Sequence, residues 1–105
     1  MKVQFLWFSD CPNHEAARSM LLAVLKKSGI DTEFADIDAT DPDVAAELRF
    51  PGSPTIRVEG VDIEPGFADP GDYTPRCRLY ATEQGLRGVP KREWIDAALK
   101  RALLQ

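Results

Sequence analysis

Cys11 stands at the point of this sequence where nucleophilic chemistry is easiest to build. It follows an apolar run at residues 3–8 and precedes a long amphipathic segment that starts at Pro12. This pattern predicts a strand that ends just before Cys11 and a helix that begins just after it. Free backbone N–H groups in the first turn of a helix stabilise an anion, so a cysteine there can ionise near neutral pH. The alternative is a structural cysteine in the core.

Two neighbours can change the ionisation of Cys11. His14, the one histidine, completes the sequence Cys11-Pro12-Asn13-His14, and in its protonated form it can stabilise a thiolate or protonate a leaving thiol. It can equally be a solvated residue at a helix start, where the helix dipole disfavours its charged form. Asp10 opposes ionisation, because a carboxylate disfavours a second negative charge nearby.

The second cysteine, Cys77, follows a proline- and glycine-rich stretch at residues 64–76. If a strand at residues 61–63 runs toward the sheet edge that holds Cys11, this stretch returns Cys77 to that edge. Cys77 can then resolve a mixed disulfide formed on Cys11, provided that the two Cα atoms come within about 7 Å. A cysteine buried in a strand is the alternative. A metal site would need Cys11, His14, Cys77 and a carboxylate together, and we predict none.

Composition limits the class of protein and its partners. The chain has 105 residues, 44% of them apolar and 29% charged, which predicts one globular domain over residues 1–105. Its net charge is −4 and its basic residues form no run longer than a pair, so we expect neither nucleic acid nor a membrane as partner. The apolar run at residues 3–8 is too short for a signal-peptide core. We therefore expect a cytoplasmic, reducing environment.

Hydrophobic periodicity and turn residues predict the order β-α-β-α-β-β-α. Alternation of strands and helices at the start indicates an α/β fold, with a mixed central sheet flanked by helices. The expected elements are a strand at 2–8, a helix at 12–28 that ends at Gly29, a strand within 30–37, a helix from Pro42 to about 49, strands at 55–58 and 61–63, a long loop at 64–76, a short further strand at 77–80, and a helix from Pro90.

This order of elements, with Cys11-Pro12-Asn13-His14 opening the first helix and Ser53-Pro54-Thr55 opening the third strand, resembles the thioredoxin-like superfamily over essentially the whole chain. The resemblance implies a thioredoxin-like fold. It also implies that Cys11 takes the place of the nucleophile and that Pro54 takes the place of the cis-proline that faces it.

The resemblance further implies where a substrate binds. Backbone groups before the cis-proline, here those of Ser53, would pair with an incoming disulfide or glutathione peptide as an extra strand. Ser53, Pro54 and Thr55 are accordingly the expected substrate-binding residues, and Cys11, His14 and Cys77 the expected catalytic residues.

Two departures separate the chain from named subfamilies. Position 14 is His where dithiol members have the second cysteine of Cys-x-x-Cys, and no Trp-Cys pair occurs because Trp7 precedes Cys11 by four residues. A Gly-Gly glutathione motif of the glutaredoxin type is also absent from the sequence. The chain looks more like small bacterial thioredoxin-like proteins that carry Cys-Pro-Asn-His.

Three functions remain open on these residues. The first is thiol–disulfide exchange with a disulfide-containing protein or a small thiol, in which Cys11 is the nucleophile and Cys77 or an external thiol resolves the mixed disulfide. This reaction needs no resident cofactor, and glutathione is a candidate co-substrate. The second is a non-catalytic thioredoxin-fold binding module. The third is the handling of soft metals or organomercurials by the two thiols.

Overall fold

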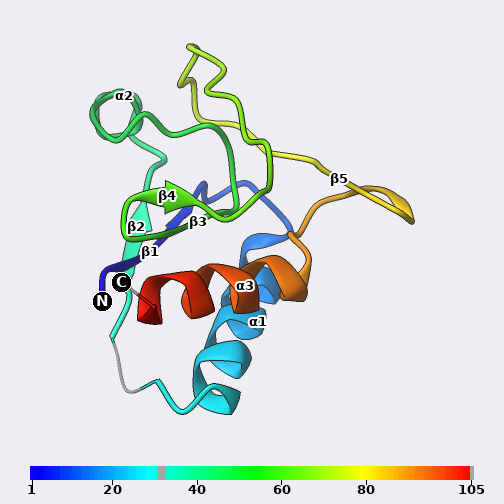
Figure 1. The fold of residues 1–105 in the computed structure, drawn as a ribbon. Helices are drawn as coiled ribbons and strands as arrows, with labels where there is room; N and C mark the ends of the chain where they lie inside the picture. Colours follow the sequence, from blue (N-terminus) through cyan, green and yellow to red (C-terminus); the bar gives the residue numbers. More distant parts are fainter. Residues whose placement is uncertain (31–32, 105) are drawn as a thin grey trace.

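The computed structural model describes residues 1–30 and 33–104, and Figure 1 shows its ribbon. Part of the strand expected within residues 30–37 lies outside the described residues. The elements are β1 (Val3–Trp7), α1 (His14–Lys27), β2 (Ala35–Asp38), α2 (Pro42–Glu47), β3 (Thr55–Val58), β4 (Val61–Asp62), β5 (Tyr80–Thr82), β6 (Gly85–Arg87) and α3 (Arg92–Leu103).

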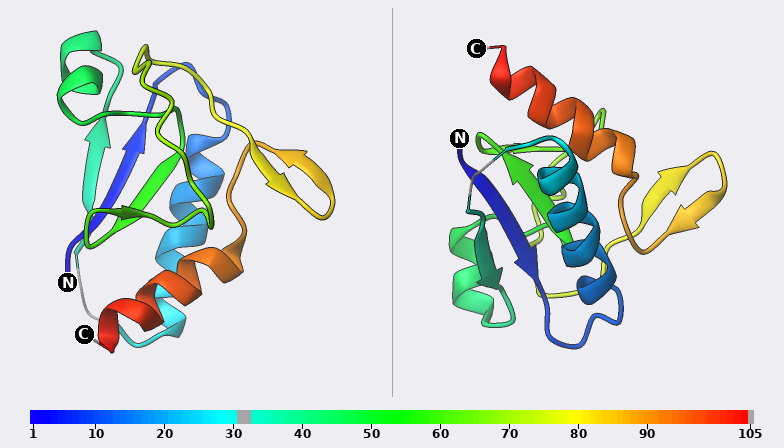
Figure 2. Two further views of the ribbon diagram at one scale, coloured as in Figure 1. Left: turned by 45° about the horizontal axis from the view of Figure 1, so that its top comes forward. Right: turned by 90° about the horizontal axis from the view of Figure 1, so that it is seen from below.

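The main sheet is mixed and has the strand order β2-β1-β3-β4. β1 pairs in parallel with β2 and antiparallel with β3, and β4 pairs antiparallel with β3. The fan of these strands is seen best in the left view of Figure 2. The predicted α/β fold with a mixed sheet flanked by helices is confirmed at this level.

Both faces of the sheet are covered, which explains why β1 is apolar at nearly every position. Phe5 and Leu6 point to opposite faces and are both fully buried. Phe5 packs with α1 and α3, whereas Leu6 packs with Ala45 of α2 and with Phe50. The right view of Figure 2 shows α1 and α3 together on one side of the sheet and α2 on the other.

The predicted ends of the helices are confirmed to within a few residues. Asp41 caps α2 by accepting a hydrogen bond from the Asp43 amide at 2.8 Å. Gly29 takes a positive φ of 68° directly after the last turn of α1. α1 begins at His14 rather than at Pro12. α2 ends at Glu47, before the predicted residue 49, because the backbone turns at Arg49, which has a φ of 53°.

The second hairpin differs from the sequence-based expectation. The strand predicted at residues 77–80 is only an isolated β-bridge at Cys77, and a separate hairpin of β5 and β6 begins at Tyr80. It projects from the body of the molecule in Figures 1 and 2. Its two-residue turn lacks the usual Asn-Gly signal, and the positive φ falls instead on Gly85.

No helix in the described part of the chain is both long enough and apolar enough to cross a membrane.

Candidate active site

The candidate active site forms where the end of β1 meets the beginning of β3. These strands are antiparallel and Leu6 pairs with Thr55, so the segment that follows β1 lies beside the segment that precedes β3. Cys11 belongs to the first segment and Ser53 to the second. The sheet topology therefore brings together two residues that are far apart in the sequence.

The Cys11 sulfur is buried and has two polar neighbours. Cys11 is only 3% exposed. Its thiol donates to the carbonyl oxygen of Ser53 across 3.5 Å, and its Sγ accepts from the backbone N–H of Asn13 at 3.4 Å. Asn13 is the N-cap residue of α1. A thiolate on Cys11 would therefore lie at the positive end of a four-turn helix, with one N–H group already directed at it.

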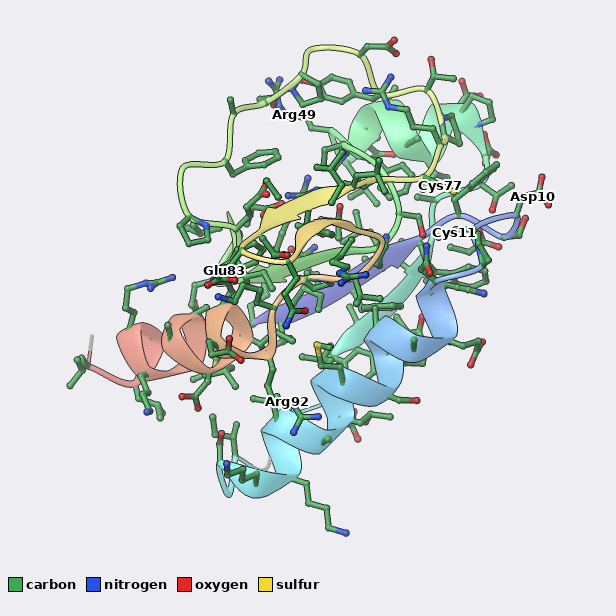
Figure 3. The ribbon with its side chains drawn as sticks, turned by 90° about the vertical axis from the view of Figure 1, so that its right-hand side faces the viewer. Asp10, Cys11, Arg49, Cys77, Glu83 and Arg92 are labelled. Carbon is green, nitrogen blue, oxygen red and sulfur yellow. The ribbon has the colours of Figure 1, made fainter. Side chains whose placement is uncertain are left out.

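Cys77 lies at the same edge, held there by its backbone. It forms a parallel β-bridge with Ser53: the Ser53 N–H donates to the carbonyl oxygen of Arg76, and the Arg78 N–H donates to the carbonyl oxygen of Ser53, both at 2.8 Å. Figure 3 shows Cys77 next to Cys11. The prediction that the loop at residues 64–76 returns Cys77 to the Cys11 edge is confirmed.

The two thiols interact with each other. The pKa of Cys77 is raised above its usual value, first by partial burial of the thiol, then by the charge and hydrogen bonding of Cys11, and then by the charge of Asp10. Both cysteines are free thiols, and Cys77 is exposed where Cys11 is buried. The site is thus a reduced pair of neighbouring thiols with unequal access to solvent.

A buried ion-pair network fixes the segment that carries Cys77. The Arg78 guanidinium donates to both carboxylate oxygens of Asp62 at 2.7 and 3.0 Å and to Glu64 at 3.1 Å, and it also reaches the Thr55 hydroxyl at 3.0 Å. Burial opposes the charge of Arg78, but these hydrogen bonds raise its pKa above the usual value. Arg78 thereby ties the residue after Cys77 to β3 and β4.

Gly52 permits the close approach of that segment to Ser53. A Cβ atom at Gly52 would lie 2.8 Å from the Cβ of Arg78, and its φ of 135° is one that residues with side chains rarely adopt. Sequence reasoning missed both Gly52 and Arg78. Gly52 does have a local signal, because it stands between two prolines in Pro51-Gly52-Ser53-Pro54, whereas nothing local distinguishes Arg78 from a surface arginine.

The expected substrate-binding residues are present at the site but are covered. Ser53 and Thr55 are fully buried, Pro54 is nearly so, and the Ser53–Pro54 peptide bond is cis. The Thr55 hydroxyl donates to the carbonyl oxygen of Gly52 at 2.6 Å. Both backbone groups of Ser53 are already bonded to Arg76 and Arg78. The edge expected to receive an external peptide is therefore occupied by the chain itself.

His14 lies near the site without bonding to the sulfur. Its ring stacks on Trp7 with centroids 4.8 Å apart, its Nδ1 is buried without a hydrogen-bond partner, and its Nε2 is 3.8 Å from the Glu15 carboxylate. The hydrogen bonds of the Cys11 sulfur go to Ser53 and Asn13 instead. The structure therefore places His14 in the first turn of α1 but does not bring it into hydrogen-bonding contact with the Cys11 thiol.

Comparison with known proteins found no match: no family model, no curated protein and no solved structure matches the chain. Within residues 1–30 and 33–104, no group of three or more His, Cys, Asp and Glu side chains is arranged to hold a metal ion. The arrangement of Cys11, Cys77 and Ser53 is the remaining basis for assigning a function.

Proposed function

We propose that this protein is a thiol–disulfide oxidoreductase of the thioredoxin-like superfamily, with Cys11 and Cys77 as its two exchanging thiols. One observation carries the proposal. Cys77 forms a β-bridge with Ser53, and the carbonyl oxygen of Ser53 contacts the Cys11 sulfur at 3.5 Å. Two free thiols whose segments meet at one backbone group support a reversible disulfide between them.

The superfamily assignment rests on three features of the chain. A cysteine precedes the first helix, a cis-proline precedes β3, and the elements up to β4 follow the order expected for the fold. Cys11 and the Ser53–Pro54 segment lie in contact, which supports the assignment more strongly than either motif does in sequence.

The exchange reaction uses only the two thiols and an external disulfide. One of the two protein thiolates attacks one sulfur of the disulfide, forms a mixed disulfide and expels the other sulfur as a thiolate. The second protein thiolate then attacks the protein sulfur of that mixed disulfide, and the second external thiolate leaves. The product is a Cys11–Cys77 disulfide, and two equivalents of an external thiol such as glutathione restore the reduced pair. His14 has no assigned step, since its ring stacks on Trp7.

The proposal is tested by oxidising the protein with diamide and assaying exchange. We expect an intramolecular Cys11–Cys77 disulfide, found by peptide mapping without reduction, and a glutathione-coupled disulfide reductase activity that Cys11→Ser abolishes. Ser28→Ala, at the opposite end of α1 from Cys11, is a control that should retain full activity. A wild-type protein that forms no internal disulfide and shows no turnover would exclude the proposal and leave a non-catalytic binding module as the better description.

A further inference from the structure

We propose that Cys77, and not Cys11, is the sulfur that meets the external reactant, and that this reactant is a low-molecular-weight thiol or disulfide. The inference rests on the proposed exchange between Cys11 and Cys77 and assigns its order of events. Cys77 exchanges with the outside, and Cys11 exchanges only with Cys77.

Access to the two sulfurs is unequal. Cys11 is 3% exposed and its thiol is bonded to the Ser53 carbonyl oxygen, whereas Cys77 is exposed. Thiol–disulfide exchange requires the attacking sulfur to reach the sulfur that it attacks. An external thiolate approaching a Cys11–Cys77 disulfide therefore reaches the Cys77 sulfur first.

When the Cys11–Cys77 disulfide breaks, Cys11 is also the better leaving thiolate. The Cys11 sulfur accepts a hydrogen bond from the Asn13 N–H and lies at the beginning of α1, and both features stabilise negative charge that develops on it. Negative charge on Cys77 is disfavoured by partial burial of the thiol, by Cys11 and by Asp10, which together raise its pKa. Since exchange is faster when the departing sulfur is the more stable thiolate, attack at Cys77 with departure of Cys11 is preferred.

The steps balance as follows. An external thiolate attacks Cys77, the Cys11–Cys77 bond breaks, and its electron pair goes to Cys11 as a thiolate that takes a proton from solvent. A second external thiolate attacks the outer sulfur of the mixed disulfide and releases Cys77. Two external thiols are oxidised to one disulfide while the protein disulfide is reduced to two thiols. In the opposite direction, Cys77 opens a small disulfide and Cys11 then expels the second thiolate.

The size limit on the reactant follows from Ser53. An extended polypeptide that added to this edge as a strand would need the N–H and carbonyl of Ser53, which are bonded to Arg76 and Arg78. The Arg78 network and Gly52 hold that segment in place. A small reagent can reach the exposed Cys77 without displacing the segment.

The test compares Cys11→Ser with Cys77→Ser, each treated with cystamine and followed by intact mass. Each variant keeps one thiol, so each can gain one cysteamine adduct. We expect the adduct on Cys77 to form at least about tenfold faster than the adduct on Cys11, because access limits the second reaction. Equal rates, or faster modification of Cys11, would overturn the inference.

A second measurement on the wild-type protein does not depend on the folding of either variant. The diamide-oxidised protein is mixed with excess cysteamine, quenched with acid after short times, and mapped by mass spectrometry. We expect the trapped mixed disulfide on Cys77, and a trapped adduct on Cys11 would overturn the inference while leaving the proposed exchange intact. If diamide produces no internal disulfide in the first place, the proposed function itself fails.

Discussion

Ser53 and Cys77 lie opposite each other in a parallel β-bridge, and the carbonyl oxygen of Ser53 accepts hydrogen bonds from both the Arg78 N–H and the Cys11 thiol. One backbone group thus connects the two thiol-bearing segments. The position of Cys77 depends on the pairing of its backbone segment with Ser53 and on the residues that hold this segment in place. Those residues are therefore suitable targets for mutation.

Replacing Asp62 with Asn should destabilise the protein. Arg78 and Asp62 are almost fully buried, with side chains 7% and 3% exposed, so the change leaves a buried guanidinium with a weakened set of partners. We expect the free energy of unfolding, measured by urea denaturation, to fall by about 3 kcal/mol. Formation of the Cys11–Cys77 disulfide should also slow down.

Asp96→Asn is the matched control for this change. Asp96 pairs with Lys100 on the surface of α3, with side chains 43% and 73% exposed, and such pairs contribute less than about 1 kcal/mol. If Asp62→Asn costs no more than Asp96→Asn, the Arg78 network does not anchor the Cys77 segment.

Gly52→Ala should move the Cys77 segment away from Ser53. The new Cβ would approach the Arg78 Cβ to 2.8 Å, and that part of the backbone has little freedom to yield. Gly66→Ala is the control, because Gly66 also has a positive φ, of 72°, but has no neighbouring atom within 4 Å of the added Cβ. We expect Gly52→Ala to slow diamide-driven disulfide formation and Gly66→Ala to leave it unchanged. Equal rates in the two variants would contradict the assigned close packing.

The alkylation of Cys77 should require a more alkaline pH than that of a free cysteine peptide. A raised pKa means that less thiolate is present at any given pH, so the pH at half-maximal rate shifts upward. The Cys11→Ser variant isolates Cys77 and removes one cause of the shift, so its transition should fall closer to the peptide's while burial still holds it above. Rates of iodoacetamide labelling against pH, read by mass, check this. A Cys77 transition at or below that of the peptide would contradict it.

Acid should release the loop at residues 64–76. Asp69 accepts hydrogen bonds from Tyr73, Gly71 and Arg49, which lower its pKa to about 2. A carboxyl with a lowered pKa stabilises the folded loop above its ordinary pKa, near 4, and that contribution is lost as the pH falls toward 2. Protection of the Gly71 amide against hydrogen exchange should therefore increase as the pH rises from 2 to 4, after correction for intrinsic exchange rates.

Asp69→Asn should mimic the acid state of the loop at neutral pH. Its Gly71 amide should exchange faster than in the wild-type protein, and this difference should disappear at pH 2. Identical protection of Gly71 in the two proteins at neutral pH would show that the Asp69 contacts do not hold the loop.

The parts of the site that could be predicted from sequence are those with local signals. An apolar run followed by an amphipathic segment placed Cys11 at the start of α1, and chain direction through β3 and β4 placed Cys77 at the same edge. The contacts of Arg78 with Asp62 and Gly52 join residues far apart in sequence, and they exist only once β3 and β4 are packed. For the same reason, sequence patterns could not show that the chain would cover its own Ser53.

Because its pairing with Ser53 holds Cys77 near Cys11, oxidation of the two thiols would change the free energy of unfolding of the whole domain. A disulfide from Cys11 to Cys77 would enclose α1, β2, α2, β3 and β4 in one covalent ring, and a ring of that size removes conformational entropy from the unfolded chain worth about 4 kcal/mol. Oxidation would then raise the melting temperature of the whole domain as well as converting two thiols. The oxidised chain would be the longer-lived form, and its thermal denaturation would report the state of the pair.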